Sequence, residues 1–307
     1  MSDAIPNSIL DFVRADRRRD GLWATKLAYY LMWFEYLAIS PSYEIARRIR
    51  SDTLRDIDRE RMPADIDDVL AVYDDLHDVQ RTLFPVWWRK YGLSHFGYEG
   101  SPPRVTKVGD LFHDKINGVE PRRMRRFIEN GWVDQGKQRS VLVAIPTGLP
   151  TGRITRQVNA ILNKLDESER MLQPPRAKYP LLGQRHHKET MFRYLGAIWL
   201  RTAAPRWALW RVGARSGVSD TYSPELDPKA KVVSGQQVYD REMLTILTSR
   251  ALLRGRMIAE NAARGRFPSY VPCVDAMLFD YPPLYKQISS RKRWQKAEKK
   301  RLAPGRS

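Results

Sequence analysis

The spacing of apolar residues predicts a chain built mainly of helices. Between residues 22 and 38 the apolar side chains recur at intervals of three and four, which is the period of a helix with one buried face. Ser40 followed by Pro41 is typical of a helix N-cap with proline at the first helical position. The other helices predicted in this part of the chain span 43–60, 65–77 and 84–92, the last ending at Gly92.

After residue 100 the pattern changes to a mixture of strand and helix signals. Residues 140–145 are β-branched, apolar on both faces and followed by Pro146, which predicts a strand covered on both sides. A short strand at 104–108 and amphipathic helices at 119–130 and 153–165 are also predicted. We therefore expect a small α/β section with a short sheet.

The last third returns to helical spacing, and it ends in a basic tail. Helices are predicted at 188–201, 205–214 and 236–264, and again within the tail at 291–301. The expected fold class is mainly α, with a helical N-terminal region, a small α/β insert and a basic helical C-terminal domain. The expected regions are 1–100, 101–173, 184–285 and the tail 286–307.

Residues 212–219, which read Val-Gly-Ala-Arg-Ser-Gly-Val-Ser, resemble the core of a helix-turn-helix. In that motif a small residue lets two helices pack closely, and a later glycine makes the turn. The resemblance implies DNA binding through a recognition helix directly after residue 219. Pro224 falls where it would break that helix, so an ordinary helix hairpin is the alternative interpretation.

Charge is distributed unevenly along the chain. Residues 1–100 contain 14 Lys and Arg against 17 Asp and Glu, a net charge of −3, whereas the whole chain carries +18. The remaining residues therefore carry +21, a surface that a polyanion would neutralise. Apolar residues make up 42% of the chain, so a disordered polyelectrolyte is excluded. We expect a nucleic-acid partner, DNA ahead of RNA, and no membrane span, because Lys26 and Glu35 interrupt the most apolar window.

Basic side chains between 185 and 301 are the candidate phosphate contacts, and an aromatic residue among them is placed to stack on a base. Arg250 and Arg254 share a face of the predicted helix, being four residues apart. The candidate nucleic-acid-binding residues are Arg185, Lys188, Arg211, Arg215, Arg250, Arg254, Arg256, Arg264, Arg291, Lys292, Arg293, Trp294, Lys296, Lys299 and Lys300. A candidate anion site is the loop before a helix that contains Gly148, Gly152 and Arg153.

Signals for catalysis, cofactors and metal binding are weak, and no catalytic residue, cofactor or metal ligand is assigned. The chain has one cysteine, Cys273, which excludes an internal disulfide and a cysteine-based zinc site. A single thiol and the lack of a signal-peptide pattern at the start predict a cytoplasmic protein. Neighbouring His186 and His187 would point about 100° apart on a helix, which disfavours a shared metal ion.

Acidic residues of the first hundred positions support an alternative, a metal-dependent nuclease or a subunit of a nucleic-acid-processing complex. The cluster comprises Asp65, Asp67, Asp68, Asp74, Asp75, His77 and Asp78. Asp74 and Asp78 are expected on one helical face, where carboxylates could converge on magnesium. The acidic half could equally dock on a protein partner or on a second copy of the chain.

A third interpretation of the whole chain is an RNA-binding ribonucleoprotein component.

Overall fold

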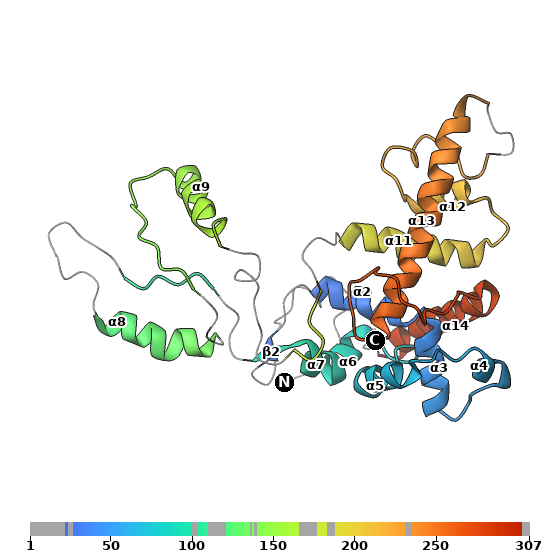
Figure 1. The fold of residues 1–307 in the computed structure, drawn as a ribbon, viewed down its shortest axis with the longest axis horizontal. Coiled ribbons are helices and arrows are strands. Elements are labelled where there is room, and N and C mark those ends of the chain that lie inside the picture. Colours follow the sequence, from blue (N-terminus) through green and yellow to red (C-terminus); the bar gives the residue numbers. More distant parts are fainter. Residues whose placement is uncertain are drawn as a thin grey trace, which may run out of the picture. The chain divides into compact units, whose positions relative to one another are not determined.

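The computed structural model describes residues 22–23, 27–99, 104–109, 121–135, 137, 140–165, 177–182, 188–230 and 235–302. These residues are mainly helical, as the apolar spacing predicts. They form two compact units (Figure 1): the larger contains the helices of 27–96 and of 188–302, and the smaller contains those between 121 and 162. The four regions expected from sequence remain a prediction. The larger compact unit combines helices that are separated in the sequence by the smaller one. Within the described ranges, no helix is both long and apolar enough to span a membrane.

The first half of the larger unit is a set of short helices connected by tight turns. They are α2 (Leu27–Leu37), α3 (Pro41–Arg50), α4 (Asp56–Glu60), α5 (Ile66–Leu76), α6 (Phe84–Trp87), the π-helical turn η1 (Trp88–Gly92) and α7 (Leu93–Phe96). The start of α3 agrees with the prediction: Ser40 Oγ accepts a hydrogen bond from the Tyr43 N–H at 3.2 Å, and Pro41 is the first helical residue. The single helix predicted for 43–60 is instead α3 and α4, separated by a turn in which Asp52 has φ +52°.

Gly92 does not end a helix, in contrast to the prediction, because the chain continues as α7. A Cβ at this position would lie 2.6 Å from a ring carbon of Trp88, so glycine is required there by close packing of an indole. The same indole stacks on Phe96, with ring centroids 6.2 Å apart and planes inclined by 2°. Trp33 and Trp87 are fully buried, and their ring centroids lie 4.7 and 6.0 Å from that of Phe96, so these rings complete an aromatic core.

The second half of the larger unit contains longer helices that pack on one another. They are α11 (Lys188–Ala203), α12 (Leu209–Ser216), the 3₁₀ turn η3 (Gly235–Gln237), α13 (Val238–Ala262) and α14 (Tyr281–Leu302). Helix α13 crosses α11, packs against α12 and also contacts α2 (Figure 1). Two glycines permit these close contacts: a Cβ at Gly213 would lie 2.1 Å from Thr248 Oγ1, and one at Gly255 would lie 2.6 Å from Ile198 Cδ1.

The helix-turn-helix core is not confirmed, because no recognition helix follows α12 in the described residues 218–230. Gly217 ends α12 with φ +64°, and the segment beyond it contains turns. Ser223 Oγ donates to the Gly213 carbonyl at 3.1 Å and accepts from the Ser219 N–H at 3.1 Å, which folds this segment back on α12. Gly213 does allow two helices to approach closely, but its partner is α13.

The smaller unit lacks the sheet expected around residues 140–145. Its strands are β1 (Leu22–Trp23) and β2 (Tyr98–Glu99), an antiparallel pair with Leu22 opposite Glu99, and its helical elements are α8 (Pro121–Arg126), the π-helical turn η2 (Phe127–Trp132) and α9 (Thr151–Leu162). Segments 140–145 and 104–108 belong to no strand. Leu142 is 61% exposed and Ile145 48% exposed, so the cover that a doubly apolar strand requires is not provided by the residues described in this unit.

Candidate nucleic-acid interface

Helix α14 divides its side chains between an inner face and an outer face. Most of the buried and half-buried positions recur at intervals of three and four, and these are 281, 284, 287, 288, 291, 294, 295 and 298; positions 289 and 290 are half-buried as well. This inner face packs against α11 and other elements of the larger unit. The helix predicted at 291–301 is confirmed and extends over 22 residues as the docked helix α14, whereas residues 303–307 of the predicted tail lie outside the described residues.

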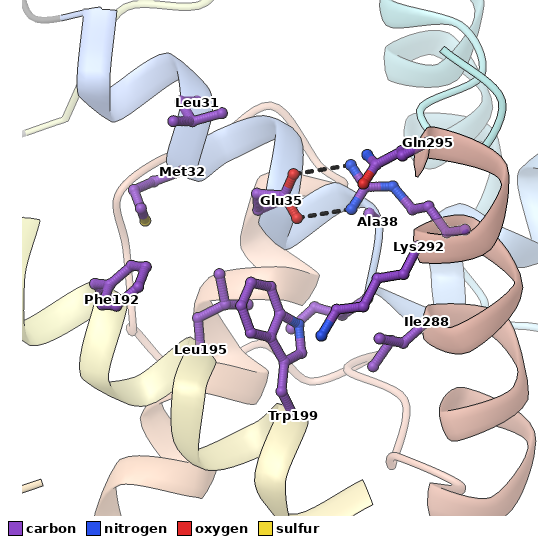
Figure 2. A pocket seen from close by; sticks show the side chains of 12 residues that line it. Leu31, Met32, Glu35, Ala38, Phe192, Leu195, Trp199, Ile288, Lys292 and Gln295 are labelled. Atoms are coloured by element: carbon purple, nitrogen blue, oxygen red, sulfur yellow. Dashed lines mark hydrogen bonds and ion pairs between the residues drawn. The ribbon is translucent and has the colours of Figure 1, made fainter. Parts of the chain in front are cut away.

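Arg291 holds α14 in place from its inner face. Its guanidinium donates to both carboxylate oxygens of Glu35, at 2.7 and 2.9 Å, through the ion pair drawn in Figure 2. Its Nε donates to the Val79 carbonyl at 3.0 Å, and the group lies over the Phe34 ring at 4.9 Å from the centroid. Because all three nitrogens of this guanidinium donate hydrogen bonds inside the protein, Arg291 is not available as a phosphate contact.

Six exposed cations of α14 form a group named here the α14 surface, which covers the outer face of the helix and includes Lys292 at the edge beside α11. It comprises Lys286, Lys292, Arg293, Lys296, Lys299 and Lys300. Positions 286, 293 and 300 are seven residues apart, so they follow one side of the helix at steps of about 10 Å. Trp294, predicted to stack on a base, is half-buried among the inner positions and is not presented with them.

Helix α13 contributes a second exposed group, the α13 surface, formed by Arg250 and Arg254 as the spacing predicts. Arg254 donates to the Tyr194 hydroxyl at 3.2 Å and lies over the Tyr270 ring at 5.3 Å from its centroid. Arg256, on the same helix, is half-buried, and its Nε has no hydrogen-bond partner among the described groups.

Arg264 lies in the interior, so its guanidinium is not available as a phosphate contact. Its side chain is 1% exposed and donates to both oxygens of Asp65, at 2.6 and 2.7 Å. A further hydrogen bond of 3.1 Å reaches Glu260 Oε2, and another of 3.1 Å reaches the Asp275 carbonyl. This guanidinium therefore connects the residue before α5 with the end of α13 and with the segment that contains Asp275.

The remaining predicted cations occur singly. Arg211 donates to the carbonyls of Pro228 and Ala230, at 2.7 and 2.8 Å, which closes the loop after α12. Arg215 and Lys188 are exposed. Arg185 lies outside the described residues.

The α13 and α14 surfaces meet different sides of α11. Arg254 contacts Tyr194, whereas the Lys292 ammonium lies 4.9 Å from the centroid of the Trp199 ring. Five residues separate these two aromatic side chains on α11, which corresponds to a rotation of about 140° around the helix axis. We therefore treat the α13 and α14 surfaces as two separate candidates.

The predicted anion loop lies in the smaller unit and has no observed ligand-binding geometry. Gly152 is already within α9, and Arg153 is exposed. A Cβ at Gly148 or Gly152 would meet nothing within 4 Å, so neither glycine is required by a close approach of the chain to itself. The loop remains a prediction.

Three members of the predicted acidic cluster, Asp65, Asp74 and Asp75, are used in ion pairs. Asp74 accepts two hydrogen bonds from Arg50, at 2.6 and 2.7 Å, and these hold the pKa of Asp74 below its usual value. Asp75 accepts from Lys178. Helix α5 ends before His77, whose φ is +55°, so the expected shared helical face of Asp74 and Asp78 is wrong. The described residues contain no group of three or more potential metal ligands.

Two carboxylates that organise this region were missed by the sequence reasoning. Glu35 interrupts the apolar helix α2, and Glu260 is fully buried near the end of α13. An isolated carboxylate in an apolar segment is a signal in itself, because burial of a charge requires a partner. The partner of Glu35 is 256 positions away, so the local sequence does not identify it.

Comparisons with known proteins supply no precedent for this arrangement. No family model matches the chain, and neither a curated protein nor a solved structure matches it. The functional proposal therefore depends on the geometry and charge of the α14 and α13 surfaces.

Proposed function

We propose that the protein binds nucleic acid, duplex DNA ahead of RNA, mainly through the α14 surface. One observation carries the proposal: six exposed cations lie on one packed helix, and no salt bridge joins them to a carboxylate in the described part of the chain. A helix that is already docked does not have to be ordered when it binds, so less of the binding free energy is lost.

The contacts expected of this surface are with phosphate rather than with bases. Lysine acts as a point charge toward phosphate, and contacts to phosphate carry no information about base sequence. Trp294, which could have stacked on a base, is half-buried. If the six cations each neutralise one phosphate of duplex DNA, the slope of log affinity against log salt is about −5.

The direct test reverses three charges on the outer face of α14, in the variant Lys296→Glu/Lys299→Glu/Lys300→Glu. Binding of a labelled DNA duplex is measured by fluorescence anisotropy at several salt concentrations. Three lost phosphate contacts make the salt slope shallower by about 3, with affinity falling for all sequences alike.

The matched control reverses three exposed cations elsewhere in the same unit, in Arg59→Glu/Arg206→Glu/Lys229→Glu. Both variants change the net charge equally, so a difference between them reports position and not total charge. Equal losses in the two variants would reject the α14 surface as the contact. Affinity independent of salt in the unmodified protein would reject the proposal as a whole.

A second candidate, binding of single-stranded RNA or DNA, is favoured by the α13 surface. The Arg254 guanidinium lies over the ring of Tyr270, which is 46% exposed, and an arginine–aromatic pair can support an unstacked base. Competition among duplex DNA, single-stranded DNA and RNA, at two salt concentrations, separates the candidates. If Tyr270→Ala weakens single-strand binding and leaves duplex binding unchanged, the second candidate is preferred.

A further inference from the structure

A small cavity lies between α2, α11 and α14 (Figure 2). Its volume is about 220 Å³. All of its walls belong to the larger unit and to described residues, so its shape is set by helices that pack on one another. An engineered cavity of about 150 Å³ holds benzene, and this volume therefore accommodates one ring with a short polar substituent.

The walls are predominantly apolar. Helix α2 contributes Met32, α11 contributes Leu195 and Trp199, and α14 contributes Ile288. Phe192 also lines the cavity and is 55% exposed, which places an aromatic ring where the cavity meets solvent. Such a lining favours an apolar body, because a nucleobase would have to leave most of its polar edge without hydrogen bonds.

The charged groups of the lining leave one positive charge in excess. Glu35 and Arg291 neutralise each other, since both carboxylate oxygens accept from the same guanidinium. The third charge is Lys292, whose ammonium lies 4.9 Å from the centroid of the Trp199 ring (Figure 2). No salt bridge joins Lys292 to a carboxylate in the described residues.

We propose that this cavity binds a small organic anion, a carboxylate attached to a single ring or a short apolar chain. The apolar body packs among Met32, Leu195 and Ile288, and the carboxylate pairs with the Lys292 ammonium beside Trp199. This inference goes beyond nucleic-acid binding and does not require it. Its test is performed on the full chain without nucleic acid, so the two proposals can fail separately.

The probes are phenylacetate and its neutral isostere phenylacetamide, titrated into the protein with isotope-labelled isoleucine methyl groups. A ligand of this size in a site of this kind is expected to dissociate at about 0.1–1 mM. The Ile288 methyl signal, assigned with Ile288→Val, shifts on saturation with phenylacetate. The methyl signal of Ile57, which is exposed on α4 away from the lining, does not shift.

Three variants test the assignment. Lys292→Gln weakens phenylacetate about three- to fivefold, the effect of one exposed ion pair, and leaves phenylacetamide unchanged. Lys229→Gln removes an equal charge from an exposed position outside the lining and changes the affinity for neither ligand. Met32→Trp fills the cavity and weakens both ligands more than tenfold, provided its thermal unfolding confirms that it folds.

Three results would overturn the proposal. The first is no saturation by phenylacetate up to 20-fold above the expected range. The second is binding that persists unchanged in a folded Met32→Trp protein, which locates the ligand elsewhere. The third is equal affinity for the acid and the amide together with no effect of Lys292→Gln, which leaves an apolar cavity without preference for an anion.

Discussion

Arg264 donates to both carboxylate oxygens of Asp65, at 2.6 and 2.7 Å, although 199 positions separate the two residues. The same guanidinium contacts Glu260, which also accepts from Ser40 Oγ at 2.6 Å and from Ser42 Oγ at 2.5 Å. These hydrogen bonds connect the start of α3, the residue before α5 and the end of α13. Helices from the first and last thirds of the chain are therefore joined by a polar network whose members hydrogen-bond to one another inside the protein.

Replacing Arg264 by methionine should destabilise the fold strongly. The variant leaves Glu260 fully buried and Asp65 mostly buried without their cation, which costs about 3–5 kcal/mol for a buried pair. Urea denaturation followed by tryptophan fluorescence measures the loss. Arg250→Met, on the exposed side of α13, is the control and should change stability by less than about 0.5 kcal/mol. Similar effects of the two substitutions would contradict the proposed importance of the network.

Gly213→Ala should destabilise the contact between α12 and α13. The added Cβ would meet Thr248 Oγ1 at 2.1 Å and Leu244 Cγ at 2.9 Å, and overpacking of this kind costs about 1–3 kcal/mol. Gly196→Ala is the matched control, because it lies within α11 with no atom within 4 Å of its Cβ. There alanine should stabilise the protein by about 0.5–1 kcal/mol. Thermal unfolding of the two variants should therefore shift in opposite directions.

The spacing of apolar residues predicted the mainly helical fold class, but a run of basic residues did not reveal which side chains face outward. Arg291, Lys292 and Arg293 appear equivalent in sequence, yet successive helical residues turn by about 100°. Arg291 consequently points inward to Glu35, whereas Lys292 and Arg293 are exposed. Which side of α14 faces inward depends on the elements that it packs against. These elements are distant in the sequence, so the local pattern does not identify them.

Single glycines and the segment 140–145 show the same limit. Gly92 resembles a helix cap, but its position is determined by the Trp88 ring that packs over it. The β-branched residues of 140–145 favour an extended chain, but a strand also needs a partner, which the local pattern does not specify. The glycine at 213 was expected to allow close helix packing, and it does so against α13 rather than against a recognition helix.

Acid should weaken the fold through carboxylates that are paired in the native state. Hydrogen bonds from Arg264 hold the pKa of Asp65 below its usual value. A carboxyl with a lowered folded-state pKa adds stability above its unfolded pKa of about 3.9, and that stability is lost as pH falls through the folded-state value. Urea midpoints measured from pH 6 to pH 2.5 should therefore fall below about pH 4. Asp65→Asn should be less stable at pH 6 and show a shallower decline, whereas an unchanged decline would assign the acid sensitivity to other groups.

Arg291→Gln should loosen α14 by leaving Glu35 mostly buried and unpaired. Because the Glu35 side chain is 17% exposed, the expected loss of about 2–3 kcal/mol is smaller than the 3–5 kcal/mol typical of fully buried pairs. Glu35→Gln alone leaves the arginine unpaired, and the double variant removes both charges. A double-mutant cycle should therefore give a favourable coupling energy above about 1 kcal/mol. Hydrogen exchange locates the effect: amides of α14 should lose protection in Arg291→Gln and recover part of it in the double variant. Protection that stays unchanged in Arg291→Gln would mean that the other contacts of α14, including the Gln287 hydrogen bond to the Ala38 carbonyl at 3.0 Å, are sufficient to dock the helix.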